Sequence, residues 1–296
     1  MKAILLVALC LVAAGFIAVW ARAVARGNTR LGTPTWIESA IGFGTNFFDT
    51  LGIGSFAPTT ALFRMWRLVP DERIPGTLNV GHSLPTVAQA LIYIVIIQVD
   101  VTTLVILIAS ASVGAWLGAG IVARWPRQRI QIGMGLCLLG ACGLFVATNL
   151  KLVPGGGDAV MLQGPSLAAA TLGNFLLGAL MTLGIGLYAP CLIMLSLLGM
   201  NPKAVFPIMM GSCAFLMPIA SIRFIREGVY SLRPALGLTF AGVPAVLLAA
   251  FVVKSLPLTA IRWLVTVVVL YTAVTMLATG IRKSKFPSTE SLPATD

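Results

Sequence analysis

Residues 50–58 read T-L-G-I-G-S-F-A-P, and residues 182–190 read T-L-G-I-G-L-Y-A-P. The two stretches share seven of nine residues and begin 132 positions apart in a chain of 296. Each lies in the middle of a long apolar segment, which its glycines and proline interrupt. A motif that recurs at corresponding places of two halves indicates an internal duplication, so these two stretches decide the predicted fold.

The composition indicates an integral membrane protein. Apolar residues make up 58% of the chain and charged residues 10%, whereas soluble domains carry about 25% charged residues. Apolar runs long enough to cross a bilayer recur along the whole sequence. We therefore predict an all-α fold, a polytopic transmembrane helical bundle. The apolar segments fall near 3–20, 37–65, 75–98, 101–123, 130–150, 167–200, 204–224, 234–254 and 258–281.

The basic residues indicate that the two interrupted segments, 37–65 and 167–200, are re-entrant hairpins. If all nine segments crossed the membrane, Lys and Arg would divide 10 against 10 between its faces. If both interrupted segments return to the face they start from, the division becomes 15 against 5, a normal positive-inside asymmetry. Arms of roughly 14–17 residues would also be short for a crossing of ~30 Å.

The predicted topology is therefore seven spans and two hairpins that open on opposite faces. We expect a first transmembrane helix and cytoplasmic loop at 1–36, and a disordered cytoplasmic tail at 282–296. Repeat 1 covers 37–150 and repeat 2 covers 151–281, each a hairpin plus three spans. For residues 1–20 a cleaved signal peptide and a retained span both stay open, and the lack of a small-x-small cleavage site favours the span. Inverted repeats with discontinuous helices are typical of secondary transporters.

The two hairpin tips form the candidate binding site. Each returning helix points its N-terminus toward the membrane centre, where free N–H groups and about half a positive charge suit a small anion. Simple helix kinks are the other interpretation of these glycines and prolines. The candidate substrate-binding residues are Thr50, Gly52, Gly54, Ser55, Thr59, Thr182, Gly184, Gly186 and Cys191.

Two ionisable residues are candidates for proton coupling: Asp49 beside the first tip, and His82 about seven residues into the following span. Asp49 could carry protons, pair with His82, or cap free N–H groups at the tip. His82 could couple transport to protons near neutral pH or make a satisfied interhelical hydrogen bond. Three amides, Asn79, Gln89 and Asn174, are expected to form polar interhelical contacts.

Other classes of function are disfavoured. The net charge of +11 arises from Lys and Arg in short loops, without the interleaved aromatic residues of a nucleic-acid site. A single histidine excludes a multi-histidine metal site, and we predict no cofactor. Five cysteines inside apolar segments indicate free thiols. No G-x-S-x-G, H-E-x-x-H or aspartate pair is present, so no hydrolase or other enzyme is predicted.

Three short motifs resemble the sulfite exporter TauE/SafE permease family. Phe48-Asp49-Thr50-Leu51-Gly52-Ile53-Gly54, with Thr59 beyond it, looks like the first-half tip of the family's acidic-residue subgroup. Asn79-Val80-Gly81-His82-Ser83 is similar to the polar stretch on the next span of that subgroup. The third motif, Gly199-Met200-Asn201-Pro202-Lys203-Ala204, resembles the turn after the second hairpin. Residues 67–73 depart from the family, because this turn is longer and more charged than usual.

The resemblance covers most of the chain after residue 36. It implies a permease of the bacterial inner membrane that moves sulfite, an organosulfonate or a related sulfur oxyanion, usually as an exporter. The N-terminus would lie outside and the C-terminus in the cytoplasm. An anion channel is an alternative, because half-helices can also line a pore. A thiol–disulfide oxidoreductase is another, but the position that matches Cys191 in the first half holds Thr59.

Overall fold

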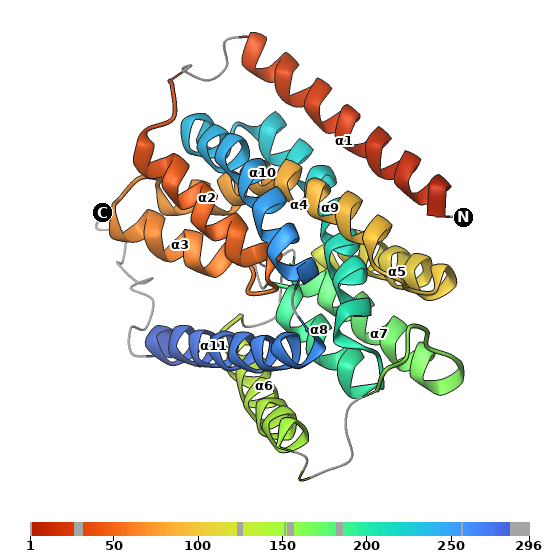
Figure 1. Ribbon diagram of the computed structural model, residues 1–296. Helices are drawn as coiled ribbons and strands as arrows, with labels where there is room; N and C mark the ends of the chain where they lie inside the picture. The colour runs from red at the N-terminus through yellow and green to blue at the C-terminus, as the bar shows by residue number, and fades with distance from the viewer. Residues whose placement is uncertain are drawn as a thin grey trace.

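A computed structural model describes residues 2–26, 32–122, 127–150, 152, 157–181, 186–255 and 257–284. Within these ranges the chain forms eleven α-helices, one short 3-10 helix and no strand, which confirms the predicted all-α bundle (Figure 1). The helices are α1 (Lys2–Ala25), α2 (Trp36–Thr50), α3 (Phe56–Met65), η1 (Asp71–Arg73), α4 (Ile74–Ile96), α5 (Val101–Val122), α6 (Arg127–Asn149), α7 (Gly164–Met181), α8 (Tyr188–Leu197), α9 (Pro202–Glu227), α10 (Leu232–Ser255) and α11 (Leu258–Ser284).

Both interrupted segments fold back on themselves as helical hairpins, α2–α3 and α7–α8. Gly173 in the middle of α7 contacts Met194 near the end of α8, so these two arms lie side by side. In the first hairpin, Ile41 of α2 belongs to one buried apolar cluster with Phe63 of α3. The predicted hairpin geometry is therefore confirmed for both segments.

The two hairpins open at opposite ends of the bundle. Glu38 at the start of α2 forms a 3.1 Å ion pair with Arg233 at the start of α10. At the opening of the second hairpin, Ala159 before α7 pairs with Met200 after α8. Helix α9 begins just after Met200 and ends just before the turn to α10, and its 26 residues span about 39 Å. One opening therefore lies at each end of this helix.

The packing between helices follows a pseudo-two-fold symmetry. Helix α2 packs against α10, while its counterpart α7 packs against α5; α4 packs against its counterpart α9, and α6 against α11. In the α4–α9 pair, Thr86 contacts Met217 and Ser83 contacts Ser221, so these two helices run antiparallel. Counterparts that run antiparallel are related by an axis perpendicular to the helices, which makes the repeats inverted.

Small residues bring the backbones of the interlocked helices together. A Cβ atom added to Gly178 of α7 would collide with the carbonyl oxygen of Ala111 on α5. In the other half, a Cβ atom on Gly42 of α2 would lie 2.6 Å from the carbonyl oxygen of Gly237 on α10. Close approach through glycine is a common packing mode of membrane helices. Each hairpin is thereby fixed to the opposite repeat.

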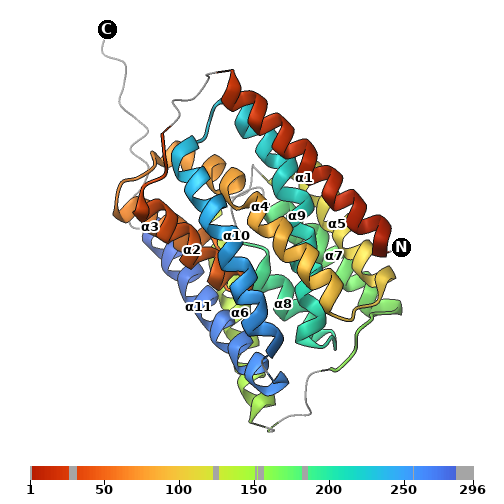
Figure 2. The same ribbon diagram turned by 45° about the horizontal axis from the view of Figure 1, so that its top comes forward.

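The outer surface and the helix lengths are those of a multi-pass membrane protein. By length and composition, five helices of the described part of the chain could cross a membrane, namely α1, α4, α7, α9 and most of α10. Shorter apolar stretches lie in α5, α6, α8 and α11. Large apolar side chains such as Trp116 and Phe251 stand 80% and 74% exposed on the outside of the bundle, which a lipid surrounding accommodates. Figure 2 shows the long helices lying side by side along one direction.

The arm lengths of the hairpins differ from the prediction. The returning arms α3 and α8 have only 10 residues each, or about 15 Å, which is half of a ~30 Å hydrocarbon core. The incoming arms α2 and α7 have 15 and 18 residues. Helix α7 is long and apolar enough to count as a candidate span by itself. Its contact with α8 nevertheless makes it an arm of the hairpin, because apolar length alone does not distinguish an arm from a span.

Candidate functional site

The first hairpin tip is a helix C-cap that glycine makes possible. The amide of Ile53 donates to the carbonyl of Phe48 at 3.2 Å, and the amide of Gly52 donates to that of Asp49 at 2.8 Å. These are the two bonds of a Schellman motif. Gly52 and Gly54 have φ angles of 98° and 86°, where a side chain would be strained. The amides that follow α2 are thus satisfied at the end of that helix.

The carboxylate of Asp49 closes the same tip. It is 3% exposed and accepts hydrogen bonds from the backbone amide and the hydroxyl of Ser55. Gln89 of α4 donates a third hydrogen bond to Asp49 Oδ2, at 2.8 Å. These contacts agree with the interpretation that Asp49 caps N–H groups at the tip, and they hold the start of α3 against the end of α2.

The two returning helices begin in the same way. Helix α3 starts with Phe56-Ala57-Pro58 and α8 with Tyr188-Ala189-Pro190, so each proline lies in the first turn, as predicted. The residues before them, Ser55 and Leu187, make no side-chain cap to the helix. Because first-turn amides have no partner within a helix, each of these helices presents its first two N–H groups outward.

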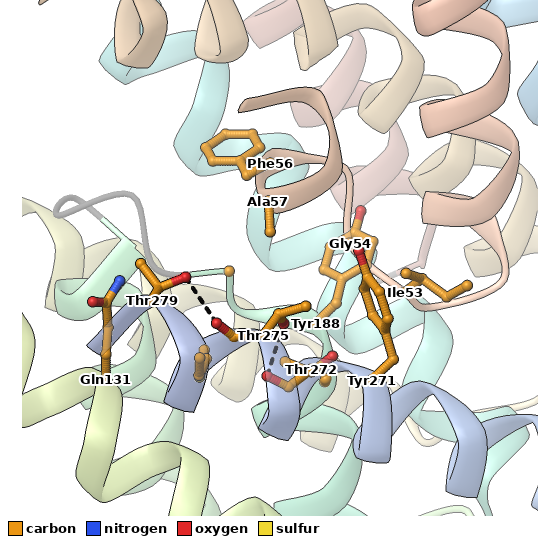
Figure 3. A pocket seen from close by; sticks show the side chains of 13 residues that line it. Ile53, Gly54, Phe56, Ala57, Gln131, Tyr188, Tyr271, Thr272, Thr275 and Thr279 are labelled. Carbon is orange, nitrogen blue, oxygen red and sulfur yellow. Dashed lines mark hydrogen bonds between the residues drawn. The ribbon is translucent and has the colours of Figure 1, made fainter. Parts of the chain in front are cut away.

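Both hairpin tips line two cavities. The larger of these two cavities, of about 90 Å³, lies in front of both helix starts (Figure 3). This volume holds several water molecules or a solute of a few heavy atoms. Helices α6 and α11 form its other wall. Of the described residues that line it, none carries a charged side chain. The lining residues are Ile53, Gly54, Phe56, Ala57, Gln131, Gly186, Tyr188, Ala189, Tyr271, Thr272, Thr275, Met276 and Thr279.

Three threonines of α11 line this larger cavity, in addition to Tyr188 and Tyr271. Thr272, Thr275 and Thr279 each donate a hydrogen bond of 2.8–3.0 Å to a carbonyl oxygen of α11. Figure 3 shows two of these bonds as dashed lines. Since their hydrogens are engaged within the helix, these hydroxyls offer the cavity oxygen lone pairs.

Among the described residues, Gln131 of α6 is the one amide side chain that lines the larger cavity. It is 8% exposed, and its Oε1 has no hydrogen-bond partner among the residues that the structure describes. Our sequence analysis missed this residue. The available signal was an amide flanked by isoleucines, Ile130 and Ile132, within an apolar segment.

A smaller cavity of about 30 Å³ lies on the other side of the tips, toward α4 and α9. It shares Gly54, Phe56, Gly186 and Tyr188 with the larger cavity. The two tips therefore meet and separate the two spaces. The smaller cavity is lined by Asp49, Gly54, Ser55, Phe56, Thr86, Met181, Gly186, Leu187, Tyr188, Cys213 and Met217.

Gln89 connects the two tips through what we call the Gln89 bridge, formed by Asp49, Thr50, Gln89 and Tyr188. Besides its bond to Asp49, its Nε2 donates to Thr50 Oγ1 at 3.0 Å. Its Oε1 accepts a 2.7 Å hydrogen bond from the hydroxyl of Tyr188, the first residue of α8. The predicted interhelical role of Gln89 is confirmed, and the bridge joins residues of both repeats.

A separate polar cluster holds the first hairpin to α4. His82 Nδ1 lies 2.9 Å from Asn46 Oδ1 on α2, and Nε2 lies 3.2 Å from Thr59 Oγ1 on α3. The Nδ2 group of Asn46 donates to the carbonyls of Gly42 and Leu238, so Oδ1 is the accepting atom and His82 Nδ1 carries a hydrogen. His82 is thus a satisfied interhelical contact.

The second hairpin has a similar polar cluster between α7, α8 and α9. Asn174 of α7 donates to Ser212 Oγ on α9 at 3.2 Å, and Cys191 Sγ of α8 donates to Asn174 Oδ1 at 3.4 Å. Ser212 stands where His82 stands in the first half, and Cys191 where Thr59 stands. The predicted interhelical role of Asn174 is confirmed, whereas that of Asn79 is wrong, because its half-buried side chain donates to the carbonyl of Pro75 in its own helix.

The structure brings only part of the predicted site to the cavities. Gly54 and Gly186 line both cavities, and Ser55 lines the smaller one. Thr50, Thr59 and Cys191 lie behind the tips, where each is hydrogen-bonded to a neighbouring helix. Gly52 faces side chains of α8 and α9, including Leu192 and Met209. The remaining predicted site residues, Thr182 and Gly184, lie outside the described residues.

The ionisable and thiol groups near the tips have separate partners. Asp49 bonds to Ser55 and Gln89, and His82 to Asn46 and Thr59, so the suggested direct pairing of Asp49 with His82 is wrong. Likewise Cys213 donates to Met181 Sδ, and Cys191 to Asn174. Among the described residues, no group of three or more His, Cys, Asp or Glu side chains could hold a metal ion.

Comparisons of the chain with protein-family models, with curated proteins and with solved structures found no match. A functional assignment therefore depends on the two hairpins, the cavities between them and the groups that line these cavities.

Proposed function

We propose that this protein is a secondary transporter for a small anion, which binds in the larger cavity against the starts of α3 and α8. One observation carries the proposal. Two helix N-termini without side-chain caps, Phe56-Ala57 and Tyr188-Ala189, line a single cavity at the junction of two inverted hairpins. Their amides provide hydrogen-bond donors and about half a positive charge each.

The arrangement of the hairpins supports a carrier. Their tips meet about 15 Å from the outer end of each returning arm, so a bound solute would lie near the middle of the bilayer. A site at the midplane between inverted repeats, formed by discontinuous helices, is the arrangement that alternating access uses. Each hairpin is also bonded to the next helix of its own repeat through a polar cluster, α2 and α3 to α4 and α7 to α9.

The resemblance to TauE/SafE permeases suggests sulfite, an organosulfonate or a related sulfur oxyanion as cargo. It also suggests a place in the bacterial inner membrane, with the C-terminus in the cytoplasm. The orientation has support from charge, because Arg64 at the end of α3, Arg226 at the end of α9 and Arg233 at the start of α10 lie at the end where the first hairpin opens. By the positive-inside rule this end faces the cytoplasm.

Proton coupling is part of the proposal, with Asp49 as its main candidate. Its carboxylate lines the smaller cavity and bonds through Gln89 to Tyr188, which lines the larger one. A proton on Asp49 would change the hydrogen bonds of the Gln89 bridge, and therefore how the two tips are held together. His82 is the second candidate, since its Nε2 faces a hydroxyl that can either donate or accept.

The test is flux into proteoliposomes that contain the purified protein, with sulfite, sulfoacetate, taurine, thiosulfate and sulfate as solutes. We expect saturable flux of at least one anion, at a rate that responds to an imposed proton gradient. Flux that rises linearly with concentration and ignores the gradient would indicate a channel. No flux of any of the anions above that of empty vesicles would contradict the proposal.

A further inference from the structure

We infer that the larger cavity selects oxyanions with a single negative charge, and that Gln131 is a specificity-determining residue that contacts them. This inference rests on the proposed anion site and adds the class of its substrate. It follows from a buried amide in the cavity wall whose Oε1 has no partner among the described residues, and from the charges around the cavity.

Gln131 is positioned to bind a solute. Its side chain is buried on α6 and lines the cavity opposite the starts of α3 and α8. Its Oε1 has no partner among the described residues, although buried polar side-chain atoms are nearly always hydrogen-bonded. A rotation of the amide by half a turn exchanges Oε1 and Nε2 and presents two hydrogens to an anion. A bound oxyanion therefore gives this side chain the partner it lacks.

The charges around the cavity match one negative charge. Two helix N-termini contribute about one positive charge together, and none of the described lining residues is Lys, Arg or His. The carboxylate of Asp49 stands on the other side of the tips, in the smaller cavity that shares four lining residues with the larger one. A second negative charge on the solute would find no positive side chain among the described lining residues and would be repelled by Asp49.

The opposite wall suits an uncharged substituent. On α11 the hydroxyls of Thr272 and Thr275 donate within the helix and offer only lone pairs, and Met276 adds apolar surface. An anion whose negative oxygens face the helix starts would thus direct a methyl group or a protonated oxygen toward α11. Sulfonates and hydrogen-bearing oxyanions have this polarity, whereas sulfate does not.

Equilibrium binding of methanesulfonate and sulfate to the purified protein in lipid nanodiscs tests the inference. The two probes are similar in size and shape and carry one and two negative charges. We expect methanesulfonate to bind at least about tenfold more tightly than sulfate. Equal or tighter binding of sulfate would overturn the inference and leave the proposed anion site standing. Binding of neither probe to the folded protein would contradict the anion site as well.

Substitutions at Gln131 test its assigned role. Gln131→Lys adds a positive charge to the cavity wall and should shift the affinity ratio toward sulfate by about tenfold or more. The matched control is Gln163→Lys, which makes the same change at an exposed position before α7. An equal shift in both variants would overturn the role of Gln131.

A second variant, Gln131→Leu, should weaken methanesulfonate binding about tenfold. Thermal unfolding verifies that each variant is folded. Unchanged binding in the Gln131→Leu variant would also overturn the role.

Discussion

Replacing Gln89 with leucine should loosen the contact between the two hairpin tips. The Gln89→Leu variant loses the hydrogen bonds to Asp49 Oδ2 and Thr50 Oγ1 and the bond from the Tyr188 hydroxyl. Leucine has a similar volume, so the change removes polar contacts and leaves little space behind. The carboxylate of Asp49 keeps its bonds from Ser55, whereas the buried hydroxyl of Tyr188 loses Gln89 and keeps its hydrogen bond with Thr86.

The size of the effect follows from the three lost bonds. Interhelical hydrogen bonds in membrane proteins contribute about 0.6 kcal/mol on average and about 1.7 kcal/mol at most. Three average bonds give about 2 kcal/mol and three strong ones about 5 kcal/mol. We expect a loss near the middle of this interval, about 3 kcal/mol, because one partner is a buried carboxylate and hydrogen bonds to charged groups are stronger than neutral ones.

The free energy of unfolding can be measured by titrating the protein in bicelles with sodium dodecyl sulfate. Gln163→Leu is the control, since Gln163 is exposed and its Nε2 contacts only Met161 Sδ at 3.9 Å; we expect a change below about 0.5 kcal/mol. Combining Gln89→Leu with Tyr188→Phe should destabilise less than the sum of the single changes, because both changes remove the same bond, that between Tyr188 and Gln89. A Gln89→Leu variant as stable as the control would refute the role of the Gln89 bridge.

Three further predictions concern flux in proteoliposomes. Gly186→Leu should abolish flux, because the added side chain enters the space in front of α8. The control Gly133→Leu, on the exposed face of α6 and also in open space, should leave flux intact. Equal flux in both variants would place the anion elsewhere. Asp49→Asn keeps the shape of the side chain and an accepting oxygen but removes the charge. The variant should therefore lose most of the pH response of flux and little of its anion binding. Flux equal to that of the wild type at every pH would contradict the coupling role of Asp49. A membrane-permeant alkylating reagent should leave flux intact, because Cys191 and Cys213 are buried, and inhibition would point to thiol chemistry.

The sequence was sufficient to predict the hairpins and their opposite openings. The repeated T-L-G-I-G-x-x-A-P motif located both tips, because glycine and proline restrict where a helix can end and begin again. The opposite openings followed from counting Lys and Arg, because cytoplasmic loops carry more of these residues than loops on the other side of the membrane. The pattern was specific enough to place the first turns of α3 and α8 correctly.

The side-chain contacts of the site could not be predicted in the same way. Gln131 lines the larger cavity only because α6 packs against α11 beside the tips, and no motif near Gln131 records that packing. No pattern around Asn79 indicated that its side chain bonds within α4 to the carbonyl of Pro75. The partners of Asp49 and His82 depend on how their helices are rotated about their axes. The distance of a residue from a tip along the sequence does not determine that rotation.

Membrane-sided labelling of a matched cysteine pair tests the inverted hairpins most directly. Met65 and Leu197 are the last residues of α3 and α8, and they are 62% and 52% exposed. In a background where the exposed Cys10 is replaced by serine, we expect an impermeant maleimide to label Leu197→Cys only from outside the cell and Met65→Cys only from the cytoplasmic side. Labelling of both cysteines from the same side would contradict two hairpins that enter from opposite faces, and with them the anion site between their tips.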